Sequence, residues 1–526
     1  MSTPHYITTS RGQIRIWYTG HGPCLVAIAG LTTGASVLVD ELASVCPGWQ
    51  VVVVEPPGIG GSAHAESDSL EDAGSAIAEA LEFVQDRPFT LLASEMSAAL
   101  VPATLAALRR KPATTVLIGA DRAEAWTAVG TAPPDLGSRD DGTHLNALWS
   151  FLRDRRILKP DDATLPTASG QPLPSDQDLS ESFVSAVAYP EKFAANWRMY
   201  ADGLKVISDV PGTKRISVAR ELRSVLGEPD ASSGDRLPPP TADPGGTKIW
   251  HQYVDTRSGR AHLRRAGSQG RPILVIPSGG GSSAQFAPVV SGLAETRTVI
   301  AVDYFGNGLS EKTNRDATID TLAKEAIDVL DALGLDEVDV WGSHTGACVG
   351  LELAINYPKR VRKLVMEAPV IVTPEFRRDL LANYFPDFTP DKFGLHLQHL
   401  WNWRRDMFMY WPWYRVDWST TRKLGVPRAE ALQLYVVGIL ESGPTYSRAY
   451  RAGFSYDTRS RLPHLNRPAI LSAGPNDMLA NALDDAAQLA PEGMLQIRPT
   501  PTTMWWPDPD PGAAAETLAL YRDFLG

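Results

Sequence analysis

The chain alternates short apolar runs with longer segments in which hydrophobic residues recur at helical spacing. Runs such as VVVV at 51–54 and ILVI at 273–276 contain no polar residue. Segments such as 319–335 and 513–524 instead place hydrophobic residues three and four positions apart. The first pattern is typical of strands buried on both faces, and the second of helices with one apolar face. Their alternation predicts mostly parallel sheets flanked by helices, the α/β fold class.

The same pattern occurs twice along the chain. YITTSRG at 6–12 matches YVDTRSG at 253–259, and each precedes an apolar run. GTHLNALWSFLRDRRILKP at 142–160 aligns without a gap with GLHLQHLWNWRRDMFMYWP at 394–412. Chance accounts for one such match but not for a series at nearly constant offset. The sequence therefore predicts a tandem duplication of one fold.

The duplication also sets the predicted domain boundaries. The segment at 227–247 is rich in Pro, Gly, Ser and Asp and lacks periodicity, which is typical of a linker. The first copy has no counterpart of RPAILSAGPNDMLA or MLQIRPTPTTMWWPDP, which we interpret as the last two strands and their loops. We expect the two domains to pack together as an internal pseudo-dimer. The predicted parts are a truncated domain at 1–228, a linker at 229–247 and a domain at 248–526 with a helical cap at about 373–462.

One strand-to-helix junction carries the candidate chemistry. DVWGSHTGACVG, at 339–350, places His344 between Gly342 and Gly346, after an apolar run and before a helical pattern. This is the layout of a nucleophile elbow, where one side chain stands on a strained turn at the top of a sheet. In the first copy the aligned residue is Glu95, and the flanking glycines are lost. The retained glycines favour a working site in the second copy.

These motifs together resemble the α/β-hydrolase superfamily. The resemblance covers most of both halves and implies two α/β-hydrolase-like domains, with a helical cap at least in the C-terminal copy. The motifs that carry it are the Gly-rich loop ILVIPSGGGSS at 273–283, DYFGNGLS at 303–310, the elbow, and G-x-x-D at 474–477. Members of the superfamily carry Ser, Asp or Cys at the elbow centre and a His after the last strand. Here the chain has His344 at the centre, Met504 beside Trp505 after the last strand, and no histidine beyond His464. A Ser–His–Asp relay is therefore absent from its usual places, and we assign no hydrolase chemistry to the first copy.

A histidine on the elbow predicts a different catalytic group. His344 would place its ring where the missing imidazole would lie and donate a hydrogen bond to Asp477. Such a pair is a general base, because imidazole titrates near pH ~6.5 and a carboxylate orients it. The resemblance implies an oxyanion hole made by the backbone N–H groups of Thr345 and of Gly279 or Gly280. The set suits hydrolysis by an activated water, or enolate-type lyase, isomerase or cyclase chemistry. The alternative is an inactive ligand-binding or scaffolding pseudoenzyme in which His344 fills a dead site.

An aromatic segment in the cap predicts the kind of substrate. Residues 401–418 contain five of the fourteen tryptophans, which would line an apolar pocket for a hydrophobic, oxygen-bearing small molecule. Counterparts of His396, Trp401 and Arg405 persist in the first copy, where the elbow has decayed, which favours a structural role for them. The candidate pocket residues are Ser278, Ser343, His396, Trp401, Arg405, Trp411, Met504 and Trp505.

Composition limits the partners, cofactors and cellular location that we expect. A formal charge of -11 and a pI near 5.5 argue against nucleic-acid and anionic-membrane partners, which need dense Lys and Arg. The loop SGGGSS lacks the lysine of a phosphate-binding loop, and no cluster has metal-ligand spacing, so we expect no cofactor and no metal. With three cysteines and no secretory leader, we expect a cytoplasmic protein; a homo-oligomer is left open.

Overall fold

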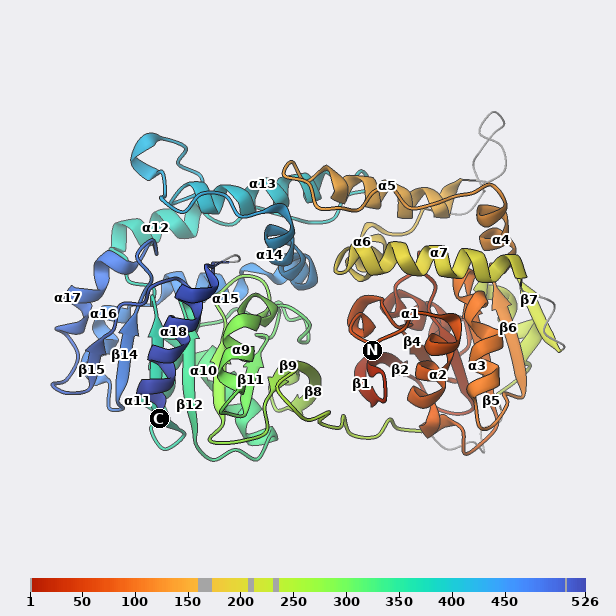
Figure 1. Ribbon diagram of the computed structural model, residues 1–526, viewed down its shortest axis with the longest axis horizontal. Coiled ribbons are helices and arrows are strands. Elements are labelled where there is room, and N and C mark those ends of the chain that lie inside the picture. The colour runs from red at the N-terminus through yellow and green to blue at the C-terminus, as the bar shows by residue number, and fades with distance from the viewer. Residues whose placement is uncertain (1, 159–172, 207–211, 230–235, 507–508) are drawn as a thin grey trace. The chain divides into compact units, whose positions relative to one another are not determined.

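The computed structural model describes residues 2–158, 173–206, 212–229, 236–506 and 509–526 (Figure 1). The chain forms two compact units. The N-terminal unit comprises Met1–Gly137, Thr143–Pro244 and Pro390–Leu395, and the C-terminal unit comprises Ser138–Gly142, Gly245–Thr389 and His396–Gly526. Part of the predicted linker 229–247 lies outside the described residues, at 230–235.

The N-terminal unit is built on a seven-stranded sheet of order β1-β2-β4-β3-β5-β6-β7. β1 pairs antiparallel with β2, and β2 with β4, while the other neighbours pair in parallel. The strands are β1 (Thr3–Thr9), β2 (Gly12–Thr19), β3 (Cys24–Ile28), β4 (Gln50–Val54), β5 (Phe89–Ser94), β6 (Thr114–Ile118) and β7 (Thr213–Ile216). The main helices are α1 (Ala35–Val45), α2 (Leu70–Ala80), α3 (Val101–Ala107), α4 (Ala120–Ala128), α5 (Thr143–Ile157), α6 (Asp176–Val187), α7 (Pro190–Val206) and α8 (Leu222–Leu226).

The C-terminal unit is built on an eight-stranded sheet of order β15-β14-β13-β12-β10-β11-β9-β8. Its strands are β8 (Trp250–Thr256), β9 (Gly259–Ala266), β10 (Ile273–Ile276), β11 (Val299–Val302), β12 (Val338–Ser343), β13 (Val361–Glu367), β14 (Ala469–Ser472) and β15 (Leu495–Ile497). Helices on the sheet are α9 (Ala287–Ala294), α10 (Ile319–Ala332), α11 (Thr345–Asn356), α17 (Leu483–Ala487) and α18 (Pro511–Leu525). Helices between β13 and β14 are α12 (Pro374–Asn383), α13 (Leu395–Met409), α14 (Ala429–Ser442), α15 (Ser447–Ser455) and α16 (Thr458–Arg461).

The predicted fold class is confirmed. Both sheets are mostly parallel and flanked by helices, and among the described residues their strands pair antiparallel at the β1–β2–β4 and β8–β9–β11 edges. The central apolar runs form the fully buried strands, as Leu25, Val53 and Leu92 do in the first unit. The two sheets share a strand order over seven strands, while the duplication itself stays a prediction.

The predicted truncation of the first copy is wrong for one strand. We expected counterparts of both final strands to be missing, but β7 pairs in parallel with β6 and forms the sheet edge. Its sequence, TKRI, carries two exposed charged residues, Lys214 and Arg215. Charged residues are common on edge strands, because they discourage pairing with another chain. An apolar run was therefore the wrong signal for this strand.

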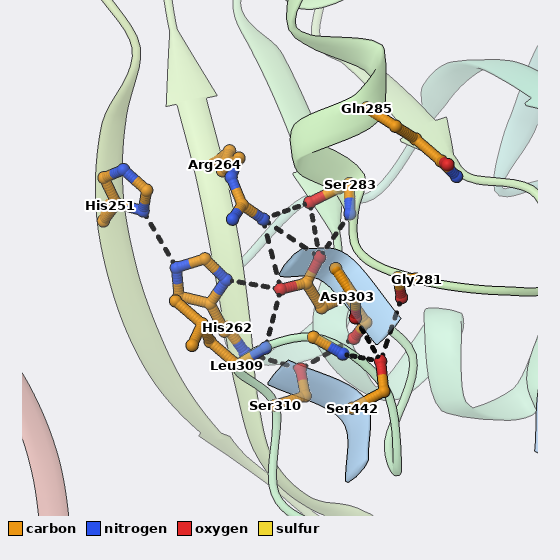
Figure 2. Close-up of polar contacts among 12 residues, drawn as sticks. His251, His262, Arg264, Gly281, Ser283, Gln285, Asp303, Leu309, Ser310 and Ser442 are labelled. Carbon is orange, nitrogen blue, oxygen red and sulfur yellow. Dashed lines mark hydrogen bonds and ion pairs between the residues drawn. The ribbon is translucent and has the colours of Figure 1, made fainter. Parts of the chain in front are cut away.

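A buried carboxylate anchors the loop that follows β11. Figure 2 shows Asp303 enclosed by donors from β9 and from the loop after β10. Its Oδ2 lies 2.8 Å from His262 Nδ1, and its Oδ1 lies 3.1 Å from Arg264 Nη1. Ser283 donates its backbone N–H and its hydroxyl to Oδ1, each at 2.6 Å. Burial opposes ionisation of Asp303, but these partners outweigh it, and the pKa lies well below its usual value.

The first unit places a carboxylate at the matching point after β4. Glu55 accepts two hydrogen bonds from Arg15 at its Oε1, 2.9 Å from Nε and 2.7 Å from Nη2. Trp17 Nε1 and the Gly61 backbone N–H donate to the same carboxylate. In both units a charged side chain thus ties the loop after the strand to the preceding antiparallel strand.

None of the helices in the described part of the chain combines the length and the apolar composition needed to cross a membrane.

Candidate active site

His344 stands on a sharp turn between β12 and α11. The strand ends at Ser343, the helix begins at Thr345, and His344 adopts φ 49° and ψ -108°. This left-handed conformation is strained for a residue with a Cβ, by about 1–3 kcal/mol. The turn is held by a hydrogen bond of 2.9 Å from the His344 N–H to the Glu367 carbonyl. The arrangement aims one side chain away from the sheet at the start of a helix.

The glycine at the start of α11 permits a close approach of helix and strand. A Cβ on Gly346 would lie 2.7 Å from the Pro277 carbonyl oxygen and would also overlap the Ile276 carbonyl. These are backbone atoms at the end of β10, so relief would require moving the strand. The glycine is therefore required by packing around the elbow.

Gly346→Ala is expected to destabilise the C-terminal unit by about 1–3 kcal/mol, the usual cost of overpacking a core. Chemical denaturation of the full chain measures the loss. The matched control is Gly512→Ala, an exposed glycine near the start of α18 whose added Cβ would meet only the Asp510 carboxylate, at 3.2 Å. The control should be neutral or slightly stabilising, because alanine favours helix. Equal stability of the two variants would contradict this account of the elbow.

The His344 ring faces Asp477. The distance between His344 Nε2 and Asp477 Oδ2 is 3.1 Å. Asp477 lies in the turn after β14, and its Oδ1 accepts the Leu479 N–H at 2.8 Å. Its side chain is fully buried, whereas the His344 side chain keeps 11% of its surface exposed. Burial by itself would raise the pKa of Asp477. The charge of His344 and the hydrogen bonds to the carboxylate lower it by more, so the pKa lies below its usual value.

The loop after β15 closes over this pair. Trp505 donates its Nε1–H to Asp477 Oδ2 at 2.6 Å, and its ring lies 5.5 Å from the His344 ring between centroids. Met504 is buried and donates its backbone N–H to Glu367 Oε1 at 2.9 Å. The structure therefore brings His344, Asp477, Met504 and Trp505 together, four of the residues that the sequence singled out.

The predicted oxyanion residues also lie side by side. A Cβ on Gly279 would lie 2.7 Å from Thr345 Oγ1, so the loop after β10 touches the elbow. The same Gly279 atom would approach the Tyr450 backbone at 2.5 Å, and the Tyr450 ring lies against Gly280. Helix α15, which carries Tyr450, therefore covers the predicted oxyanion hole closely.

Other predicted pocket residues make their described contacts elsewhere in the unit. Trp401 is fully buried and donates its Nε1–H to the Asp140 carbonyl at 2.9 Å. Arg405 pairs with its neighbour Asp406, with 3.1 Å between Nη2 and Oδ1. The Trp411 ring packs 5.8 Å from the Tyr384 ring. These contacts do not involve the His344–Asp477 pair, so the pocket-lining role of these side chains stays a prediction.

The remaining candidates differ in their surroundings. Ser343 is fully buried, and its hydroxyl has no hydrogen-bond partner in the described structure. Ser278 accepts a hydrogen bond of 2.8 Å from Gln285 Nε2. His396 is buried on α13. A small apolar pocket lies beside Tyr304 and Glu325, and its lining includes none of the residues predicted for the site.

Sequence reasoning missed Glu367, the last residue of β13. Its side chain is fully buried, and burial raises its pKa to about 7. The nearby charge of Asp477 raises this pKa as well, whereas the Met504 N–H and His344 lower it. The available signal was an acidic residue at the carboxyl end of a predicted parallel strand, where ligands of α/β folds bind.

The first unit keeps the sharp turn without its glycines. Glu95 has φ 54°, and Ser94 and Ser97 form a capping box around it. The buried Glu95 carboxylate lies 3.7 Å from Arg122 Nη2 and 3.8 Å from Arg156 Nη1. Arginine side chains thus lie beside the carboxylate that the sequence aligns with His344. Because the turn survives here, glycine retention alone is a weaker argument for activity than the sequence suggested.

Comparison with known proteins assigns a family to the second half of the chain. Residues 271–498, which contain both His344 and Asp477, match the family model described as alpha/beta hydrolase fold. The chain is 38% identical over 219 residues to a protein of Caulobacter segnis named "Putative carbamate hydrolase RutD", covering 40% of this chain and 75% of that protein. It is 37% identical over 115 residues to 2-hydroxymuconate semialdehyde hydrolase of Pseudomonas sp. (strain CF600), covering 20% of this chain and 39% of that protein.

The enol-lactonase from Burkholderia xenovorans LB400 matches with a TM-score of 0.40 and 19% identity, over 52% of this chain and 99% of that chain. The motifs, the two sheets and the relatives agree, and the family resemblance is confirmed. The chain belongs to the alpha/beta hydrolase fold family.

Proposed function

We propose that the C-terminal unit is a cofactor-independent enzyme in which His344 is the general base and acid. The observation that carries this proposal is the 3.1 Å contact between His344 Nε2 and Asp477 Oδ2 on the strained elbow. A strained backbone conformation persists where surrounding contacts hold the residue in place, and such residues cluster at functional sites. The N-terminal unit would be a scaffold, because its elbow carries the ion-paired Glu95.

The geometry supports a particular proton path. Because Nε2 faces Asp477, Nδ1 is the nitrogen that is free to act as the base, and none of the described residues hydrogen-bonds it. In hydrolysis, Nδ1 takes a proton from water as the water oxygen bonds to the substrate carbonyl carbon. The same nitrogen then returns that proton to the leaving group when the bond to it breaks. Asp477 orients the ring and stabilises the imidazolium that forms in between.

The start of α11 supports charge development in this reaction. The first N–H groups of a helix have no intrahelical partners, and the helix dipole favours negative charge there. The Thr345 N–H is the first of these in α11, and the Gly279 loop lies against the Thr345 side chain. We infer that these amides hold the oxyanion of a tetrahedral intermediate, or an enolate if the enzyme is a lyase, isomerase or cyclase.

The relatives suggest a substrate class. The names of these relatives refer to a carbamate and a semialdehyde, both of which contain a carbonyl carbon. We propose hydrolysis of a hydrophobic carbonyl compound as the main candidate, because both relatives are named hydrolases. The aromatic side chains near the site, Trp505 and Phe408, stack at 6.1 Å and offer an apolar surface to such a molecule.

A second candidate function is that of a pseudoenzyme. The observation that favours it is the close cover of the elbow by α15, since a Cβ on Gly453 would overlap Thr345 and a Cβ on Gly280 would lie 2.5 Å from the Tyr450 ring. A catalytic role requires this cover to move when substrate enters. A scaffolding or ligand-binding role does not.

The proposal is tested with a panel of carbamates, enol esters and vinylogous ketones and with a serine-reactive fluorophosphonate. We expect the full chain to turn over at least one carbonyl compound while the fluorophosphonate labels no serine, because the elbow carries an imidazole in place of a hydroxyl. Mass spectrometry of the treated protein measures labelling. Labelling at Ser343 or Ser278 would restore the serine-hydrolase mechanism, and absence of turnover across the panel would favour the pseudoenzyme.

A further inference from the structure

Glu367 is a buried carboxyl group with one unsatisfied oxygen. Its Oε1 accepts the Met504 N–H at 2.9 Å and lies 3.5 Å from the Tyr521 hydroxyl. Its Oε2 is buried and meets the geometry of no hydrogen bond in the described structure, although the hydroxyl of the neighbouring Ser343 interacts with the carboxyl group and lowers its pKa. A carboxylate in such surroundings loses its hydration without recovering full hydrogen bonding. The neutral acid is therefore favoured, which agrees with the pKa of about 7.

The backbone holds this carboxyl group against the elbow. The Glu367 carbonyl accepts the His344 N–H at 2.9 Å, and the next residue, Ala368, has φ 44°. Ala368 in turn donates its N–H to the Ser472 carbonyl at 2.8 Å. Only three non-glycine residues of the described chain have a left-handed φ, and two of them, His344 and Ala368, border Glu367. Local strain thus marks both sides of the same carboxyl group.

Other titratable groups around the carboxyl do not supply a compensating charge. Tyr521 of α18 and Tyr435 of α14 face it, and burial raises the pKa of both phenols, so they are uncharged near neutral pH. The guanidinium of Arg422 lies over the Trp505 ring, 5.1 Å from its centroid, and interacts with Asp477. The charge state of Glu367 therefore depends on its own burial, on the hydrogen bond from the Met504 N–H and on the charges of the His344–Asp477 pair.

We propose that Glu367 is a positioning residue that holds one proton behind the His344–Asp477 pair, so that the imidazole faces a single carboxylate. This inference rests on the proposed function of His344 as a base. A second carboxylate beside the ring would favour the imidazolium, which has no lone pair to accept a proton. A protonated Glu367 adds no second negative charge beside the ring.

The experiment is an infrared titration of the full chain from about pH 5 to pH 9. The carbonyl stretch of a protonated carboxyl group is distinct from that of a carboxylate. We expect wild-type protein to lose such a band as the pH rises through about 7, and Glu367→Gln to lack that band at every pH. Glu295→Gln, a control at a carboxylate whose side chain is 60% exposed, should keep it.

Coupling to the pair is measured in two further variants. In His344→Ala the band should persist to higher pH, because the imidazole lowers the pKa of Glu367. In Asp477→Asn it should disappear at lower pH, because the Asp477 charge raises that pKa. If Glu367→Gln does not fold, Glu367→Asp replaces it, in protein whose glutamate side chains carry ¹³C. The carboxyl group at position 367 is then unlabelled, so its band is missing from the ¹³C-shifted bands of the other glutamates.

The outcomes separate the two proposals. A wild-type spectrum identical to that of Glu367→Gln, or a band that neither neighbouring variant shifts, overturns the role of Glu367. These readouts require no substrate. A failure of the proposed function, such as full turnover by His344→Ala, is therefore seen independently of the infrared result.

Discussion

His344→Ala is expected to lower kcat/KM by about 10²–10⁴-fold, the range that a positioned general base contributes. The substitution removes the nitrogen that takes a proton from water or substrate. Among the described residues, those that hydrogen-bond the Asp477 carboxylate are His344, Leu479 and Trp505, so no second imidazole is bound to it. Steady-state kinetics on the carbonyl compound that the wild type turns over gives the ratio.

The same substitution should change stability little. Asp477 keeps the Leu479 N–H at 2.8 Å and the Trp505 Nε1–H at 2.6 Å, so its buried charge retains two donors. The control is His464→Ala, an exposed histidine, which should keep both turnover and stability. A His344→Ala protein that turns over substrate at the wild-type rate would transfer the chemistry to another group. A variant that unfolds would instead make the imidazole a structural residue.

Asp303→Ala is expected to destabilise the C-terminal unit by about 3–5 kcal/mol, the usual cost of breaking a buried ion pair from one side. The change removes the carboxylate that contacts Arg264, whose side chain is 7% exposed, and the fully buried His262 (Figure 2). The Ser283 and Leu309 N–H groups lose their acceptor as well. Urea denaturation of the full chain, followed by signals from each unit, measures the loss.

The stability lost in Asp303→Ala depends on pH in a predictable direction. The pKa of Asp303 in the folded protein lies well below that of an ordinary aspartate, so its ionised form stabilises the fold. That stabilisation is fully present above the pH at which an unfolded aspartate titrates and is lost as the pH falls through the folded value. The difference between wild type and Asp303→Ala should therefore be constant near neutral pH and shrink only below about pH 4. Asp316→Ala, at an exposed position, is the control and should differ little from wild type.

Much of the candidate site was predictable because its signals are local. The elbow is a contiguous pattern, in which an apolar run, two glycines and a helical period set the turn on which His344 stands. Asp477 was predictable from the order of motifs, since turns after parallel strands gather at one edge of the sheet. Glu367 was not, because its importance comes from its full burial between loops that are distant in sequence.

The packing around the elbow, like the burial of Glu367, could not be predicted from the sequence. The sequence indicates that α15 is helical and partly apolar, but not that Tyr450 and Gly453 lie against Gly280 and Thr345. The strand β7 was missed because its burial is low and its residues are charged. In each case the deciding contact joins segments separated by many residues.

The sequence by itself determined the fold class of the two halves, the position of the strained turn and the presence of His344 at its centre. These follow from short-range periodicity and glycine placement, which act within a few residues. Only the tertiary structure decided that His344 Nε2 faces Asp477, that Glu367 lies buried behind them, and that α15 covers the elbow. Those features depend on desolvation and close approach, which exist only once distant segments have packed together.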